Sequence, residues 1–334
     1  MTGGKVGILP GMIMTEKKYY IELDTLKGMS IFCVLLCHAI ILYPVNLKET
    51  PFWGEVFTIM GSVPMPLFFL VSGYCFSYKG NYKEFIKAKV LRILLPYVVF
   101  GLIDMVPRQL LSSLVNRPGN VWDSLKSMLL YGGQYWFLYT LFIIFLIYPL
   151  IYKWQKDSKV RMVITEVVLL VLTLIKVDMP LFCIDSVLFY LIYFNTGSLL
   201  KSLKIDVFQI KKPSDRVRPI LILLSAIAWG WFSLSLPYNT VTRMLFGILG
   251  IITFYLLTKY KVVNILFAGL GKYSLQLYLL NGFLLVLSRT IICRITQIPT
   301  IIVLFNLFIT MVCSYIFIKY VCGRIKFVKK LMGM

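Results

Sequence analysis

The chain has 334 residues, of which 59% are hydrophobic, with a mean hydropathy of +0.83 and a formal net charge of +21. Soluble domains are only about 45–50% apolar, so the composition excludes an ordinary water-soluble domain. The apolar residues come in blocks of about 20, the length at which a helix crosses a bilayer, separated by short polar loops. The first block carries Asp24 and Lys27 and lacks a small-residue cleavage site, so a removable signal peptide is not expected. The sequence therefore predicts an all-α, polytopic helical membrane protein.

About ten membrane-spanning helices are expected, and they form a single integral-membrane domain over residues 1–334. We see no internal repeat and no appended soluble domain. Before the fourth span, a polar loop at 115–133 contains a short apolar piece expected on the surface. In chain order, the expected spans are about 24–43, 56–78, 91–114, 134–152, 161–177, 181–200, 219–236, 241–258, 265–288 and 298–320.

The positive charge is distributed unevenly between the two sides of this arrangement. The termini and the loops after even-numbered spans hold 26 of the 35 lysines and arginines, and the opposite side holds eight. The positive-inside rule therefore predicts that both termini lie in the cytoplasm, in a multi-pass protein of the plasma or inner membrane. Contact with membrane lipids accounts for the remaining excess charge, so no nucleic-acid partner is needed. The seven cysteines show no C-x-x-C pairing, and no metal is implied.

The first span carries an unusual polar stripe. His38 is the only histidine of the chain, and Lys27 lies eleven residues before it. Eleven residues make three helical turns plus about 20°, so the two side chains share a face about 16 Å apart along the axis. Ionisable groups inside a membrane are costly and commonly functional, and a neutral imidazole suits a general base. The alternatives are a structural histidine and a lysine that snorkels to the interface. Asp24 could orient Lys27, or simply favour the helix N-terminus.

Two further segments hold candidate ligand-binding residues. Lys89 and Arg92 stand one turn apart at the expected cytoplasmic mouth of span 3, where a guanidinium suits a phosphate group. Positive-inside topology is the alternative for such charges. Ser72 and Gly73 lie in mid-span, where a glycine allows close approach of a ligand or of another backbone. Helix packing explains this pair about as well.

Aromatic and amide groups mark two later segments. Trp136, within Q-Y-W-F-L at 134–138, could stack on a sugar ring or belong to the interfacial aromatic belt. Tyr278 and Asn281 lie three residues apart in G-K-Y-S-L-Q-L-Y-L-L-N-G at 271–282, at a depth where polar groups are costly.

Taken in order, these segments resemble the membrane acyltransferase 3 family. The matching motifs are D-T-L-K-G with a histidine eleven residues after the lysine, M-P-L-F-F-L-V-S-G-Y, K-x-x-R-I-L-L-P-Y, W-F-L and G-K-Y-S-L-x-L-Y-L-L-N-G. They are most similar to the branch of fucose 4-O-acetylase-like acetyltransferases. The resemblance implies an O-acetyltransferase that moves an acyl group from cytoplasmic acetyl-CoA, or another acyl-CoA, to a hydroxyl of a cell-envelope sugar, polysaccharide or lipid-linked glycan.

The resemblance also implies roles for individual residues. The catalytic candidates are His38 and Asp24; the acyl-CoA-binding candidates are Lys27, Lys89 and Arg92; the acceptor-binding candidates are Ser72, Trp136, Tyr278 and Asn281. Relatives often have histidines where this chain has Pro64 and Asn281, so a mechanism that needs a second histidine is excluded. A glycolipid transporter or flippase, or a catalytically silent relative, is the alternative function.

Overall fold

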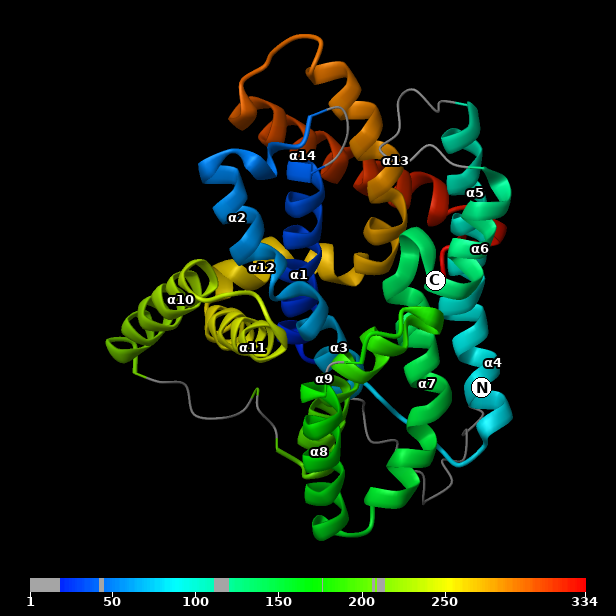
Figure 1. Cartoon of the computed structure of the whole chain (residues 1–334), viewed down its shortest axis with the longest axis vertical. Coiled ribbons are helices and arrows are strands. Elements are labelled where there is room, and N and C mark those ends of the chain that lie inside the picture. The colour runs from blue at the N-terminus through cyan, green and yellow to red at the C-terminus, as the bar shows by residue number, and fades with distance from the viewer. Residues whose placement is uncertain (1–18, 42–44, 111–119, 176, 206–207, 209–213) are drawn as a thin grey trace, which may run out of the picture.

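The computed structural model describes residues 19–41, 45–110, 120–175, 177–205, 208 and 214–334 (Figure 1), and within this part every regular element is a helix. The expected all-α class is therefore confirmed. The α-helices are α1 Ile21–Ile41, α2 Pro51–Gly61, α3 Pro64–Tyr74, α4 Tyr82–Lys89, α5 Leu95–Leu110, α6 Val121–Tyr131, α7 Trp136–Gln155, α8 Lys159–Leu174, α9 Ile184–Ser202, α10 Val217–Ser235, α11 Thr240–Leu257, α12 Lys261–Lys272, α13 Ser274–Ile292, α14 Pro299–Phe317 and α15 Lys326–Leu331.

Short helical segments extend several of these elements. A π-helical turn at Val90–Leu94 (η2) joins α4 to α5, and another at Ile318–Cys322 (η6) extends α14. The 3₁₀ turns are η1 Leu47–Glu49, η4 Gly133–Tyr135 and η5 Leu181–Cys183.

Eight helical stretches among the described residues are long and apolar enough to cross a membrane. A stretch of this kind has at least 18 residues, and α8, with 16, is too short to be counted. The helix α5 is followed by residues 111–119, which lie outside the described residues. The expected span ends at 42–43, 111–114 and 176 also lie outside the described residues. The count of ten spans and the cytoplasmic placement of both termini therefore stay predictions.

Two spans that the sequence predicts as continuous are broken helices. The expected span 56–78 falls on α2 and α3, which meet just before Pro64, because a proline lacks the N–H that would continue α2. The expected span 265–288 falls on two helices. It comprises α12 and α13, and between them Tyr273 has non-helical dihedrals (φ −110°, ψ 19°).

The helix α1 lies in the middle of the molecule, between α12, α13, α2 and α3 (Figure 1). Its crossing with α12 is close because glycines face each other there. A Cβ atom on Gly28 would collide with the carbonyl of Phe267, and one on Gly271 would collide with the carbonyl of Asp24. Small residues at a crossing allow two membrane helices to pack backbone to backbone. This contact fixes the first half of α1.

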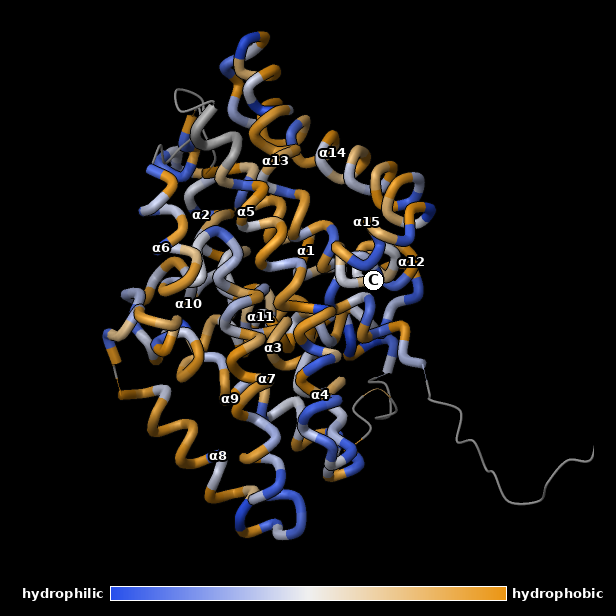
Figure 2. Tube along the Cα trace, turned by 90° about the vertical axis from the view of Figure 1, so that its right-hand side faces the viewer, coloured by the Kyte–Doolittle hydropathy of each residue, from blue (hydrophilic) through white to orange (hydrophobic). Residues whose placement is uncertain are grey.

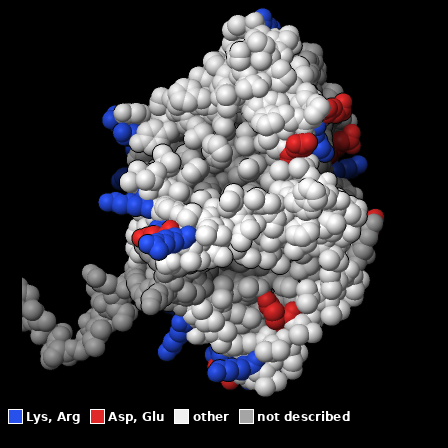
Figure 3. Space-filling view, turned by 90° about the vertical axis from the view of Figure 1, so that its left-hand side faces the viewer, with Lys and Arg blue, Asp and Glu red and all other residues white. Residues whose placement is uncertain are grey.

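The outer surface of the bundle is apolar in the way that lipid requires. Along α8 and α10, large apolar side chains are exposed at many positions, among them Val160, Val167, Leu223 and Ile227. Figure 2 shows hydrophobic residues along these helices and hydrophilic ones gathered mainly near turns. Figure 3 shows a face that is largely uncharged, with lysines, arginines and acidic residues confined to small groups. A soluble monomer does not expose apolar surface on this scale, so these faces fit a bilayer.

A polar network joins α7, α8 and α9. Asn195 donates to Glu166, and its own oxygen accepts from Tyr148 (2.8 Å) and from Gln155 (2.8 Å). Thr196 donates to the second oxygen of Glu166. Because a carboxylate in an apolar bundle is costly without donors, this network explains how Glu166 is tolerated on α8.

Candidate active site around His38

The sole histidine lies in the last turn of α1 and meets α13. Nδ1 of His38 is 2.9 Å from Oδ1 of Asn281, a residue 243 positions away in the chain. Asn281 is 2% exposed, and its Nδ2 donates to the carbonyl of Tyr278 at 2.6 Å. The structure therefore brings together three of the predicted site residues, two of them from one turn of α13.

These contacts determine which imidazole nitrogen can act as a base. Because the donor end of the Asn281 amide is committed to the Tyr278 carbonyl, its acceptor end faces His38. In the neutral ring, Nδ1 therefore carries the proton and donates it to Asn281, and Nε2 keeps its lone pair. A base oriented in this way by a third group is the arrangement that nucleophile-activating sites share.

The segment at the start of α7 packs on the same part of α13. The rings of Tyr135 and Phe137 lie 5.8 and 5.6 Å from the ring of Tyr278, and the Tyr135 hydroxyl donates to the carbonyl of Leu279 at 3.1 Å. Trp136 points elsewhere and stacks on Tyr190 at 6.0 Å. The Q-Y-W-F-L and Y-L-L-N-G motifs thus meet, but through the neighbours of Trp136.

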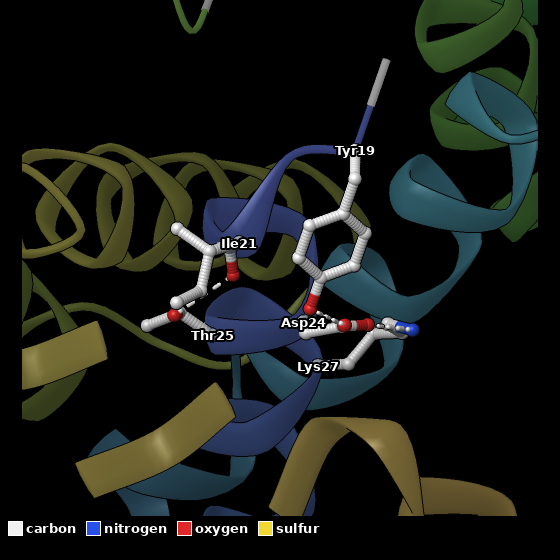
Figure 4. Close-up of polar contacts among 5 residues, drawn as sticks. All are labelled: Tyr19, Ile21, Asp24, Thr25 and Lys27. Atoms are coloured by element: carbon white, nitrogen blue, oxygen red, sulfur yellow. Dashed lines mark hydrogen bonds and ion pairs between the residues drawn. The ribbon is translucent and has the colours of Figure 1, made fainter. Parts of the chain in front are cut away.

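The other predicted polar residues of α1 lie at its opposite end (Figure 4). Asp24 pairs with Lys27 at 2.6 Å and accepts a hydrogen bond from the Tyr19 hydroxyl, also at 2.6 Å. This hydrogen bond to a carboxylate, together with partial burial, raises the pKa of Tyr19 to about 12. Asp24 precedes His38 by 14 residues, which is about 21 Å along a helix, so it contacts Lys27 and not the imidazole.

The two basic residues ahead of α5 lie close enough to influence each other. Lys89 is half-buried, with Nζ 3.8 Å from the ring centroid of Phe145. Burial and the positive charge of Arg92 lower the pKa of the Lys89 ammonium to about 8. Arg92 itself is exposed, and its backbone carbonyl lies against Gly333 at the C-terminal end of the chain. The ammonium and the guanidinium form a local basic pair.

Helix packing accounts for the glycine beside Ser72. A Cβ atom on Gly73 would collide with the carbonyl of Phe194, and one on Gly197 would collide with the carbonyl of Leu70, so α3 and α9 cross backbone to backbone. Ser72 is half-buried on α3. Of the two alternatives for Gly73, the contact with another backbone is the one observed.

A cavity of about 220 Å³ lies beside the N-terminal half of α1, among α1, α3, α9 and α11. Its walls include Leu23, Leu26, Leu70, Tyr74 and Phe208, and they are almost entirely apolar. A sugar needs polar partners for its hydroxyls, so this cavity does not suit a carbohydrate.

The fold and the site define a class: a helical membrane protein whose central helix presents a histidine held in one tautomer by a neighbouring helix. The chain belongs to the family described as the acyltransferase domain (Acyl_transf_3), whose model matches residues 20–319. No curated protein and no solved structure matches the chain at a significant level. The protein is therefore a membrane acyltransferase by family. The fucose 4-O-acetylase-like branch stays a prediction.

One buried residue of this region lies outside the expected spans. Arg289 falls just beyond the expected span 265–288, whereas the structure places it inside α13, with 0% of its surface exposed. The sequence signal for this placement is that apolar residues continue beyond Arg289, at Ile291 and Ile292.

Proposed function

We propose that this protein is an O-acetyltransferase that moves an acetyl group from cytoplasmic acetyl-CoA to a hydroxyl of a cell-envelope sugar. Membership of the acyltransferase family supplies the reaction class. The observation that carries the proposal is the bond between His38 Nδ1 and Asn281 Oδ1, because it leaves Nε2 as an oriented base inside the bundle.

The chemistry assigned to this pair balances without a metal or a redox partner. Nε2 of His38 takes the proton of the acceptor hydroxyl as that oxygen bonds to the thioester carbonyl carbon. The carbon–sulfur bond then breaks, and the departing thiolate recovers the proton from Nε2. Asn281 stabilises the protonated ring through Nδ1–H, since an amide oxygen accepts from both forms of the imidazole. Helices around the site exclude water, which would otherwise hydrolyse the thioester.

The basic groups suit the donor, which is an anionic substrate. The diphosphate and ribose phosphate of a CoA thioester attract cations, and we assign this binding to Lys27, Lys89 and Arg92. Asp24 acts through Lys27, which it holds by their ion pair at the start of α1. The spacing of about 16 Å between Lys27 and His38 along the helix suits a donor whose phosphates and thioester are joined by a long flexible arm.

We assign the acceptor to the side of His38 that faces α13 and the start of α7. Tyr278 and Asn281 come from α13, and the aromatic rings of Tyr135 and Phe137 lie against the ring of Tyr278. Trp136 and Ser72 remain predicted acceptor contacts. Sugars commonly bind against aromatic side chains, and three aromatic rings gather in this region.

The experiment that tests the proposal compares wild type, His38→Ala and Cys37→Ala in a strain that lacks the protein. Mass spectrometry measures O-acetyl groups on the envelope glycans, and membrane expression is matched by immunoblot. Cys37 is the control, because it is buried on the same turn of α1 but is not the base. Loss of a general base typically slows a reaction by about 10²- to 10⁴-fold.

We expect wild type and Cys37→Ala to restore the acetyl groups and His38→Ala to leave them absent. Equal restoration by His38→Ala would refute the assigned mechanism. No restoration by any of the three would refute acetyl transfer to an envelope glycan.

A further inference from the structure

Arg289 is the largest fully buried side chain among the described residues, and it lies on the same helix as Asn281. The two residues are eight positions apart on α13, which corresponds to about 12 Å along the axis and about 80° around it. Both reach across to α1. Two residues of α13, Asn281 and Arg289, therefore contact the C-terminal turn of α1.

The guanidinium binds the end of the catalytic helix. Nη1 of Arg289 donates to the carbonyl of Ala39, the residue after His38. Nη2 donates to the carbonyl of Val45 and lies 3.4 Å from the carbonyl of Ile40. The last four carbonyls of a helix have no partner within the helix, and α1 ends at Ile41, so Arg289 supplies donors to carbonyls of this last turn.

Burying the guanidinium of Arg289 in these surroundings has a free-energy cost that packing alone does not explain. Within the described part of the chain, no carboxylate forms an ion pair with Arg289. Its charge is balanced by the partial negative charge at the C-terminus of α1. Nε of Arg289 is also buried, and among the residues that the structure describes it has no hydrogen-bond partner. An apolar side chain would avoid both costs but could not bind the carbonyls.

We propose that Arg289 is a positioning residue that holds the last turn of α1 so that His38 keeps its bond to Asn281. Asn281 orients the imidazole ring, and Arg289 fixes the backbone on which the ring stands. A rotation or slide of α1 against α13 breaks both the His38–Asn281 bond and the Arg289 bonds. The two contacts together therefore fix one relative position of the two helices. The catalytic consequence rests on the proposed acyl transfer, whereas the structural role does not depend on it.

The single histidine makes this proposal directly measurable. In protein labelled with ¹⁵N only at histidine, every imidazole signal comes from His38, and the ¹⁵N shifts of Nδ1 and Nε2 report which nitrogen carries the proton. The spectra are recorded on the full chain in lipid nanodiscs for wild type, Arg289→Gln, Arg289→Lys and Ser288→Ala. Ser288 is the matched control: it is buried next to Arg289 and donates to Asn306 on α14 rather than to α1. Unfolding temperatures and size-exclusion profiles establish that each variant is folded.

We expect wild type and Ser288→Ala to show one tautomer with the proton on Nδ1. Arg289→Gln should show a mixture of tautomers and a kcat about 100-fold lower, the order of loss caused by a displacement of about 1 Å. Arg289→Lys keeps the charge but offers one donor group instead of a planar fork, so it should lie between wild type and Arg289→Gln.

A folded Arg289→Gln with the wild-type histidine spectrum would overturn the proposal. If that variant does not fold, Arg289→Lys decides, since a wild-type spectrum there together with a wild-type kcat would also overturn it. Absence of acyl transfer in wild type, with spectra that change as expected, would refute the proposed function and leave the positioning role standing.

Discussion

The two ends of α1 carry polar residues on one face, but they are held in different ways. At the N-terminal end, Asp24 and Lys27 bind each other three residues apart, and Tyr19 adds a contact from five residues away. At the C-terminal end, His38 is bound by Asn281 from across the bundle. The first arrangement is local and partly exposed, and the second depends on the packing of α1 against α13.

This difference indicates that the two ends of α1 have different roles. A local i,i+3 ion pair contributes little to stability, and the partly exposed Lys27 can leave it when a charged substrate arrives. A hydrogen bond between the part-buried His38 and the buried Asn281 joins two distant helices and fixes geometry, because breaking it leaves the Asn281 amide without that partner in an apolar region. The C-terminal end is suited to chemistry that needs one orientation, and the N-terminal end to reversible binding.

The largest effect is expected at the buried end. Asn281→Leu has a similar volume but removes the acceptor for Nδ1–H, so the two tautomers of His38 become available and Nε2 is no longer reserved as the base. We expect kcat for acetyl transfer to fall by about 100-fold with little change in the KM for acetyl-CoA. Steady-state kinetics on purified protein provide the measurement.

Two companion variants sharpen this result. Ser288→Ala, on the same helix but directed to α14, should keep the wild-type kcat. Asn281→Asp keeps an acceptor for Nδ1–H and loses the donor to the Tyr278 carbonyl, so its kcat should fall less than that of Asn281→Leu. Equal rates in Asn281→Leu and wild type would contradict the assigned role.

A smaller effect is expected at the basic pair, and it depends on pH. Because the pKa of Lys89 is lowered to about 8, its ammonium loses a proton as the pH rises through 8, and its attraction for phosphates weakens. The KM for acetyl-CoA should therefore rise from pH 7 to pH 9. Lys89→Arg keeps a cation over this range and should remove that rise. Initial rates over a range of donor concentrations at each pH test this.

The matched control for the basic pair is Lys87→Ala, on the exposed side of the same helix. It should leave the donor KM and its pH profile unchanged, whereas Lys89→Ala should raise the KM at pH 7 by about tenfold, about 1.4 kcal/mol of binding free energy. A pH profile in Lys89→Arg that matches wild type would show that another group titrates.

The smallest effect is expected where the contacts are local. Asp24→Asn weakens the ion pair with Lys27, and i,i+3 pairs of opposite charge on a helix are worth about 0.2–0.5 kcal/mol. We expect a change in unfolding temperature of only a few degrees or less and a change of about twofold in the donor KM. Calorimetry and donor kinetics measure the two quantities. A loss of kcat comparable to that of His38→Ala would show that Asp24 takes part in the chemistry instead.

The sequence by itself determined the all-α membrane class, the family, and the common face of Lys27 and His38. These follow from apolar length, motif order and the 3.6-residue helical period, which are local properties of the chain. The helix breaks were harder to predict, because the turn at Tyr273 depends on the close contact of α12 with α1. That break moved the start of α13 and with it the position of Arg289.

Only the tertiary structure decided which groups meet at His38. Asn281 was a candidate from its polarity at membrane depth, but neither its bond to Nδ1 nor the lone pair that this bond leaves on Nε2 follows from spacing along one helix. The binding of the α1 carbonyls by Arg289 joins positions about 250 residues apart. Such pairings depend on the rotation and depth of two packed helices, and these are set by side-chain fit across the whole bundle rather than by any local pattern.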